Sequence, residues 1–193
     1  MAPSEAEPTS PRASAILTER LALRPFTPDD LDALLAMFGD PEVTRHLDHG
    51  PLSREAAREL LARISPMTGI DAQRNELRLA VELQASGGVI GDVSLWRTST
   101  KHNQGEIGFV LHPEHQGHGY ASEGVRELLR IGFEEAGLHR IVGRCDAENT
   151  ASAALMERLG MRREAHFREN ERIKGAWSDG LVYAMLASEW AAR

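Results

Sequence analysis

The sequence is poor in the features that mark several large classes of protein. It has a single cysteine in 193 residues, which excludes an intramolecular disulfide framework and a cysteine-rich zinc module. No stretch approaches the roughly 18 consecutive apolar residues that a membrane-spanning helix needs. The start of the chain also lacks the positive charge and the apolar segment of a secretory signal. We therefore expect a soluble, cytoplasmic protein with no membrane partner.

The charge balance is acidic, with 22 basic and 29 acidic side chains and a formal net charge of −7. Such a chain is a poor general binder of polyanions, so no nucleic-acid partner is expected. The densest basic stretch, residues 158–174, intersperses arginine with glutamate, which is typical of a solvated surface.

Apolar residues make up 41% of the chain, too many for a wholly disordered protein, and the length favours one domain or at most two. Residues 1–15 hold three prolines and little that could be buried, so they predict a flexible tail. Residues 16–193 show no internal repeat and no second linker, and they predict a single domain.

The spacing of apolar residues predicts antiparallel strands followed by alternating strands and helices. Period-two alternation over residues 77–83 and 89–97, around a turn at residues 86–88, predicts a hairpin. Residues 106–112 predict a third strand with Glu106 and Val110 on one face. Further strands are expected at residues 21–23, 139–145, 161–167 and 181–186, and helices near residues 28–38, 53–64, 121–136 and 150–159. Together they predict an α/β fold with a mixed, mostly antiparallel sheet and helices on both faces.

The most informative local feature is the turn Gln116-Gly117-His118-Gly119-Tyr120-Ala121, between the third strand and a helix. Glycines there let successive backbone N–H groups converge, and the helix start adds its positive dipole end. Such a turn binds a phosphate or pyrophosphate without basic side chains, although an ordinary glycine-rich connection has the same composition. It lacks the Lys-Ser/Thr ending of a nucleoside triphosphate loop, and Ser122 breaks the G-x-G-x-x-G spacing. ATP and NAD are therefore not the expected ligands.

Three other motifs accompany this turn: Thr18-Glu19-Arg20-Leu21 in the opening strand, Glu106-Ile107-Gly108-Phe109 in the central strand, and Asn149-x-x-Ser152 at a helix start. In this order they resemble the GNAT superfamily of acyl-CoA-dependent N-acetyltransferases, and most closely its RimJ/RimL branch. The likeness covers about residues 17–190. It implies the GNAT fold, with a sheet splayed between residues 106–112 and 139–145, acetyl-CoA as cosubstrate and no metal.

The resemblance also implies a set of residues that bind the cofactor. The turn would hold the pyrophosphate, and backbone N–H groups near residues 109–111 would stabilise the oxyanion of the thioester carbonyl. Helix capping is an alternative role for both Asn149 and Ser152, because these residue types are favoured at a helix start. The implied cofactor-binding residues are Phe109, Val110, Leu111, Gln116, Gly117, His118, Gly119, Tyr120, Ala121, Ser122, Asn149 and Ser152.

The acceptor amine must be neutral to attack a thioester, so a base is expected. Two carboxylates are candidates: Glu106 at the start of the central strand, and Glu171 in an expected loop before Lys174. A solvated surface acid is the alternative for each. The family's frequent tyrosine and glutamate are missing, since Met156 and Arg144 stand at their positions. Ser152 is then the candidate that protonates the leaving thiolate.

Three other features carry less chemistry. The histidines at positions 112, 115 and 118 do not predict a metal site, because Pro113 and the neighbouring glycines prevent the helix that would bring them together. Cys145, at the end of a buried strand, is expected to fill the core. A turn at residues 177–179 would form part of the acceptor wall, with simple packing as the alternative for Trp177.

The resemblance leaves several functions open. A protein N-terminal α-amine is the acceptor expected of the RimJ/RimL branch, and a small amine, including an antibiotic, is the alternative. A weakly catalytic acyl-CoA-binding protein would belong to a different class. Proteins similar to RimL often pair, so a homodimer is a further partner to consider.

Overall fold

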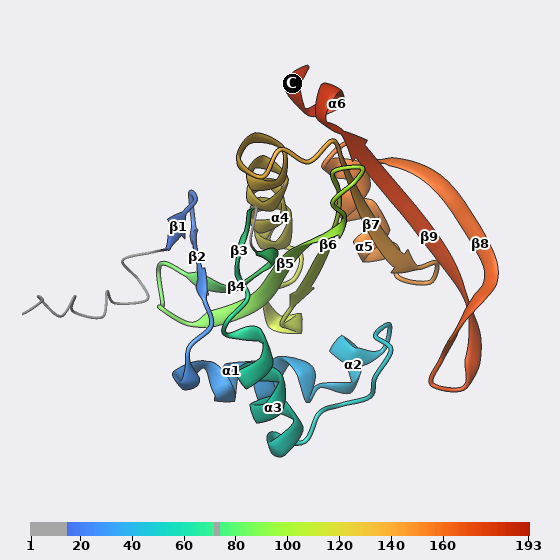
Figure 1. Cartoon of the computed structure of the whole chain (residues 1–193). Coiled ribbons are helices and arrows are strands. Elements are labelled where there is room, and N and C mark those ends of the chain that lie inside the picture. Colours follow the sequence, from blue (N-terminus) through green and yellow to red (C-terminus); the bar gives the residue numbers. More distant parts are fainter. Residues whose placement is uncertain (1–14, 72–73) are drawn as a thin grey trace, which may run out of the picture.

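The computed structural model describes residues 15–71 and 74–193, so the predicted tail, apart from residue 15, lies outside the described residues. The chain forms one large sheet with helices packed on it (Figure 1). The strands are β1 (Ile16–Leu17), β2 (Leu21–Pro25), β3 (Thr68–Ile70), β4 (Asn75–Leu83), β5 (Val89–Ser99), β6 (Gln104–Leu111), β7 (Arg140–Asp146), β8 (Arg162–Ile173) and β9 (Ala176–Leu186).

The strand order is β1-β2-β4-β5-β6-β7-β9-β8, and β3 pairs with β4 away from this path. Among the described strands every paired neighbour is antiparallel except β6 and β7. A parallel pair needs a long crossover connection, which the helix between residues 120 and 130 supplies here. The predicted mixed, mostly antiparallel sheet is confirmed.

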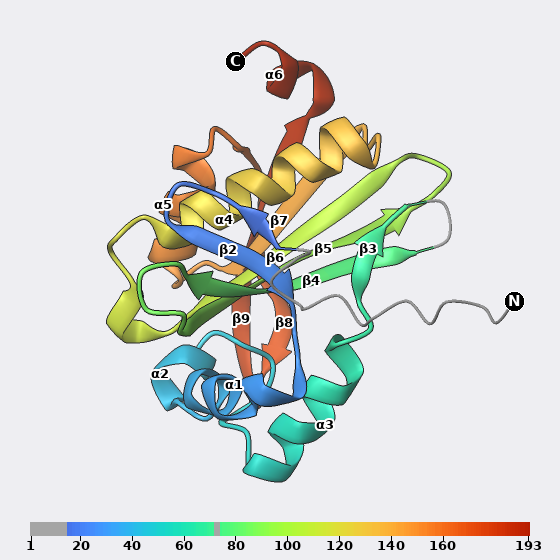
Figure 2. The same cartoon turned by 90° about the vertical axis from the view of Figure 1, so that its left-hand side faces the viewer.

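Helices cover both faces of the sheet, as expected. Val125, Leu128 and Leu129 of α4 pack with one face of the strands, together with residues of α5. Leu34 of α1 and Leu61 of α3 belong to a second cluster on the other face (Figure 2). The helices are α1 (Leu31–Phe38), α2 (Pro41–Thr44), α3 (Arg54–Ile64), α4 (Tyr120–Arg130), α5 (Thr150–Arg158) and α6 (Ala187–Ala191).

A buried network of charged side chains lies on this second face of the sheet. The Arg24 guanidinium of β2 donates to both carboxylate oxygens of Asp30 at 2.8 Å and to Glu82 at 2.7 Å. Burial alone would raise the pKa of Asp30, but hydrogen bonds from Arg24 and Thr27 outweigh it and lower that pKa. Because Asp30 stands at the start of α1, this network fixes that helix against the sheet.

The sheet opens between β6 and β7. The parallel ladder joins Gln104–Ile107 only to the first part of β7, ending at the pair Ile107 and Gly143. Beyond this pair β6 continues to Leu111 and β7 to Asp146 without contacting each other as strands. The predicted splay is therefore present, and it provides an opening in the middle of the sheet.

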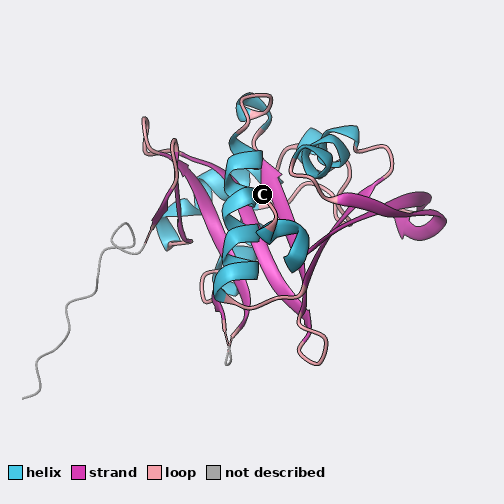
Figure 3. Ribbon diagram, turned by 90° about the horizontal axis from the view of Figure 1, so that it is seen from above, coloured by secondary structure: helices cyan, strands magenta, loops and turns pink. Residues whose placement is uncertain are grey.

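The C-terminal hairpin differs from the sequence prediction. We expected Glu171 in a loop and a turn at residues 177–179, but Glu171 lies in β8 and pairs with Ser178 of β9. The true turn is Lys174-Gly175, with φ angles of 50° and 89°, and the long hairpin projects from one edge of the sheet (Figures 1 and 3). The prediction was wrong because β8 is polar and exposed over nearly its whole length and carries no alternating pattern.

Smaller differences concern short or irregular elements. The sequence did not predict β1, α2 or β3, which have only two to four residues each. The helix expected over residues 121–136 is α4 followed by a π-helical turn, Ile131–Glu135. In the described ranges, no helix has the length and apolar character needed to cross a membrane.

Candidate active site

The glycine segment forms a tight loop that leads directly into α4. Gly117 and Gly119 have φ angles of 78° and 83°, a region that favours glycine. Gly119 is the N-cap of α4, and a Cβ added at Gly117 would meet nothing within 4 Å. The Gln116 amide donates to the Leu111 carbonyl at 3.1 Å and so fastens the loop to the end of β6. The loop thereby presents the N–H groups of the first helical turn, which have no partner inside the helix, to open space.

Arg20, in the bend between β1 and β2, contacts this loop and α4. Arg20 donates from its guanidinium to the His118 carbonyl at 2.9 Å and lies 4.6 Å from the centre of the Tyr120 ring. Glu123 of α4 accepts from the Arg20 backbone and side chain, each at 2.8 Å. These contacts explain why the opening-strand motif and the glycine turn occur together in one sequence.

A cleft of about 680 Å³ opens in front of the loop and reaches α2 on its far side. Its volume lies in the range of small-molecule sites. Every predicted cofactor-binding residue lines it except His118, whose carbonyl bonds Arg20 and whose ring stacks on Tyr120. The lining residues among those predicted are Phe109, Val110, Leu111, Gln116, Gly117, Gly119, Tyr120, Ala121, Ser122, Asn149 and Ser152.

The splayed part of β6 offers backbone donors to this cleft. The His112 N–H donates to the Ile90 carbonyl at 2.9 Å, on the side of β5. Because N–H groups alternate in direction along a strand, those of Phe109 and Leu111 point the other way, toward β7. The ladder with β7 has already ended at Ile107, so these donors lie in the opening. Such donors are suited to stabilising charge that develops on a carbonyl oxygen.

Asn149 and Ser152 stand at the start of α5 on the cleft wall. Asn149 Oδ1 accepts from the Ser152 backbone N–H at 3.0 Å, so Asn149 is the N-cap of this helix. The capping role is therefore real for Asn149, but it uses only the side-chain oxygen. Within the described part of the chain, the Asn149 amide nitrogen and the Ser152 hydroxyl have no hydrogen-bond partner.

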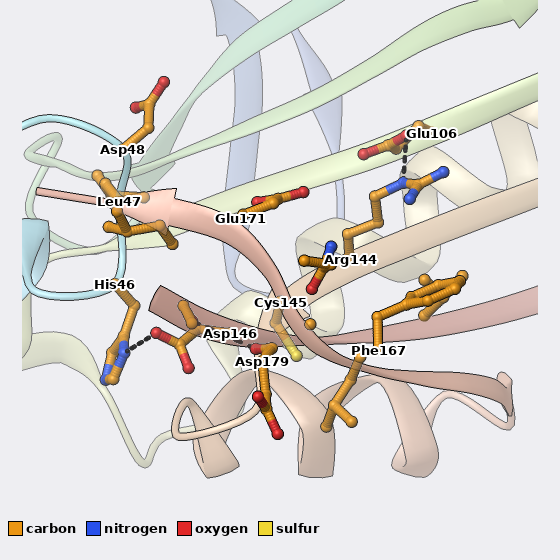
Figure 4. Close-up of a pocket in the computed structure, with 16 residues that line it drawn as sticks. His46, Leu47, Asp48, Glu106, Arg144, Cys145, Asp146, Phe167, Glu171 and Asp179 are labelled. Carbon is orange, nitrogen blue, oxygen red and sulfur yellow. Dashed lines mark hydrogen bonds and ion pairs between the residues drawn. The ribbon is translucent and has the colours of Figure 1, made fainter. Parts of the chain in front are cut away.

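A second cleft, of about 310 Å³, adjoins the first and contains both predicted base candidates (Figure 4). Its lining has a marked excess of negative charge, which would attract a cation. Ser178 also lines it, whereas Trp177 does not: that side chain is 62% exposed beneath Arg172. The carboxylates of this second cleft are Asp48, Glu106, Asp146, Glu171 and Asp179, set against the single arginine Arg144.

Glu106 of β6 and Arg144 of β7 form an ion pair where the ladder between these strands ends, with Arg144 Nε 3.2 Å from Glu106 Oε2 (Figure 4). Burial raises the pKa of Glu106; the Arg144 charge opposes this effect and the Glu171 carboxylate adds to it. A raised carboxyl pKa suits proton transfer near neutral pH. Arg144 is thus the ion-pair partner of one base candidate.

Sequence reasoning missed two residues that line both clefts, His46 and Leu47. They follow α2 in a stretch without periodic pattern. The His46 Nδ1 lies 3.3 Å from Asp146 Oδ2, a partner 100 residues away, so no local motif could have indicated the pair (Figure 4).

The other side chains near the clefts that could take part in chemistry are uncharged, buried or already hydrogen-bonded. Cys145 lines the second cleft, and burial raises the pKa of its thiol to about 11, so it stays protonated near neutral pH. Met156 is fully buried, and the Tyr183 hydroxyl donates to Glu157 at 2.9 Å. Across residues 15–71 and 74–193 no three His, Cys, Asp or Glu side chains group as metal ligands would.

A sheet opened at its single parallel pair, with a glycine loop at a helix N-terminus beside the opening, defines the GNAT class of fold. The chain belongs to this family: the model of the acetyltransferase (GNAT) domain matches residues 20–162. It is 33% identical over 175 residues to the uncharacterised N-acetyltransferase YnaD of Bacillus subtilis, covering 91% of this chain and 98% of that protein.

Solved structures of acetyltransferases superpose on this chain. A GNAT-family acetyltransferase from Bacillus anthracis superposes with a TM-score of 0.81 at 31% identity, over 91% of this chain and 99% of that one. A spermidine N-acetyltransferase from Vibrio cholerae, solved with CoA and spermine, superposes with a TM-score of 0.76 at 25% identity, over 90% of this chain and 99% of that one.

Proposed function

We propose that this N-acetyltransferase moves the acetyl group of acetyl-CoA onto the primary amine of a cationic acceptor. GNAT proteins use acetyl-CoA, so the cosubstrate follows from the family. One observation carries the proposal: the cleft of the glycine loop and the acid-lined cleft adjoin at the splayed strands. A thioester in the first cleft and an amine in the second would meet there.

The residues of the first cleft fit acetyl-CoA. The loop at Gly117 and Gly119 offers backbone N–H groups and a helix N-terminus to the pyrophosphate. The amide nitrogen of Asn149 and the backbone of Phe109 are available to the pantetheine arm. When bound, the cofactor supplies the acetyl group as a thioester, and the N–H groups of β6 would stabilise the charge on its carbonyl oxygen.

The lining of the second cleft supports a cationic acceptor. Five carboxylates face one arginine, so an acceptor with several amines gains attraction that a neutral amine does not. A relative solved with spermine supports a polyamine, whereas the resemblance to the RimJ/RimL branch supports a protein N-terminus. We propose the small polyamine first and a basic N-terminal peptide second.

From the sequence, Glu106 and Glu171 are two candidates for accepting the amine proton, and Ser152 is the candidate for protonating the leaving sulfur. Glu106→Gln and Glu171→Gln, compared across pH, test the two carboxylates. If neither substitution lowers the rate, another group removes the proton.

The deciding experiment follows free thiol release from acetyl-CoA with polyamines, basic peptides, aminoglycosides and neutral amines as acceptors. Release with polyamines above all others supports the proposal, while release with peptides alone transfers it to protein N-termini. Acetyl-CoA at about 100 times its Kd should raise the free energy of unfolding by about 2.7 kcal/mol. A shift without turnover for any acceptor would favour an acyl-CoA-binding protein, and no shift with any acyl-CoA would refute both.

A further inference from the structure

His46 occupies the place where the two clefts meet. In the described residues only His46 and its neighbour Leu47 line both the cleft of the glycine loop and the acid-lined cleft. Leu47 is apolar, so His46 is the one side chain at this junction that can exchange a proton. The C-terminal hairpin fixes the backbone just before His46, because Lys174 at the hairpin turn donates to the carbonyls of Thr44 and Arg45.

Asp146 orients this imidazole. The His46 Nδ1 and Asp146 Oδ2 lie 3.3 Å apart, and their side chains are only 20% and 11% exposed. Asp146 is itself fixed, since its Oδ1 accepts the Glu148 N–H at 2.8 Å in the turn before α5. With Nδ1 donating its proton to the carboxylate, Nε2 carries the lone pair, which is the tautomer that a general base requires.

Glu106 and Glu171, by contrast, line only the acid-lined cleft. The Glu106 carboxylate is also engaged by Arg144 at 3.2 Å, and Glu171 is exposed in β8. Neither carboxylate is therefore placed at the junction that both reactants must reach.

We propose that His46, oriented by Asp146, is the catalytic base of the transfer, a role that rests on the proposed function. The acceptor ammonium gives one proton to His46 Nε2 and becomes a neutral amine. Its nitrogen then bonds to the thioester carbon as the carbon–sulfur bond breaks, and its second proton goes to the leaving sulfur. The imidazolium returns its proton to solvent, so each turnover releases one proton.

The charges around His46 are mixed but mainly negative. Asp48, Glu106, Arg144, Glu171 and Asp179 line the acid-lined cleft beside it, while Glu42, Arg45 and Arg158 line the other. Asp146 is the charged residue whose side chain contacts the His46 imidazole directly. In Asp146→Asn, an amide N–H beside Nδ1 would favour the tautomer that carries its proton on Nε2, which leaves the imidazole in place but removes its basic nitrogen from the junction.

The experiment compares wild-type enzyme with His46→Gln, Asp146→Asn and the control His49→Gln. His49 lies in the same loop, contacts the Gly50 carbonyl at 2.8 Å and lines neither cleft. Asn keeps the Oδ1 acceptor at position 146, so the turn before α5 should persist. Urea unfolding checks that each variant is folded.

We expect His46→Gln to lower kcat by about 100-fold or more, with the KM for acetyl-CoA changed by less than about threefold. Asp146→Asn should lower kcat by at least about tenfold with a similarly small change in KM, and His49→Gln should match the wild type. A second readout needs no turnover: nitrogen NMR of the neutral His46 ring in the free enzyme should report the Nδ1–H tautomer in the wild type and the Nε2–H tautomer in Asp146→Asn.

Two results would overturn the inference. One is a His46→Gln enzyme within threefold of wild type, and the other is an Asp146→Asn enzyme with the kcat and the His46 tautomer of the wild type. Both leave the proposed function standing if the wild type still turns over acetyl-CoA. A wild type that binds acetyl-CoA but acetylates no acceptor refutes the proposed function, and the base assignment with it.

Discussion

Asn149 allows the capping and cofactor-binding roles of one side chain to be separated. Its Oδ1 accepts the Ser152 N–H at 3.0 Å, whereas its amide nitrogen has no hydrogen-bond partner among the described residues, and the residue lines the cleft of the glycine loop. Asn149→Ala removes both functions. Asn149→Asp keeps an equally good capping oxygen but deletes the N–H donor.

The expected magnitudes differ between the two variants. Losing the cap in Asn149→Ala should lower the free energy of unfolding by about 1 kcal/mol, whereas Asn149→Asp should leave it within about 0.5 kcal/mol of wild type. The lost donor is worth about 0.5–1.5 kcal/mol, which raises the Kd for acetyl-CoA by about 2- to 13-fold in both variants.

Urea unfolding measures the first quantity and titration calorimetry with acetyl-CoA the second. An Asn149→Asp protein that is stable and binds acetyl-CoA like the wild type would show that the side chain only caps α5. An Asn149→Asp protein as destabilised as Asn149→Ala would show instead that the cap itself is wrongly assigned.

Three further predictions concern the loop, the buried network and Glu106. Gly119→Ala places a Cβ on a residue with φ 83°, 3.4 Å from the Arg20 side chain, so it should lower the free energy of unfolding by about 1–2 kcal/mol and weaken acetyl-CoA binding. The control is Gly50→Ala, whose Cβ meets nothing within 4 Å. Equal acetyl-CoA binding by both variants would refute the role of the loop. Arg24→Ala removes the cation that buried Asp30 and Glu82 share, and it should lower the free energy of unfolding, measured in urea, by about 3–5 kcal/mol. Arg74→Ala, which breaks an exposed ion pair, should lower it far less. Similar losses in the two variants would contradict the role of the network. Burial raises the pKa of Glu106 above its ordinary value of 4.5, because the folded protein favours the protonated carboxyl. The stabilisation from this protonated group is therefore complete below pH 4.5 and is lost as the pH rises through the raised pKa. Glu106→Gln should therefore flatten the fall of unfolding free energy with pH in that window, and an unchanged slope would place the carboxylate in solvent.

The residues that line the cleft of the glycine loop could be predicted because their signals are local. The turn at residues 116–121 and the pair Asn149 and Ser152 each lie within a few residues, and the alternation over residues 77–83 marks a strand with one buried face. Their positions in the structure follow from strand and helix geometry that short sequence patterns already encode.

The acid-lined cleft could not be predicted, for physical reasons. Nearly all of β8 is exposed, so no apolar period marks it, and Glu171 was expected in a loop. The ladder there contains an irregularity between Phe167 and Glu171, where Glu169 adopts φ 47° and donates its N–H to Asp179. His46 meets Asp146 only through the tertiary fold, since nothing near either residue in sequence indicates the other.

The way the two clefts are distributed along the chain has an evolutionary consequence. The cleft of the glycine loop is lined by residues between Glu42 and Arg158, all inside the segment 20–162 that the family model matches. More than half of the acid-lined cleft comes from residues 167–182 of the β8–β9 hairpin, beyond that segment. Under the proposed function, substitutions in the hairpin would change which amine is recognised without altering the cleft proposed for acetyl-CoA, so relatives with one chemistry would diverge in substrate through a single structural unit.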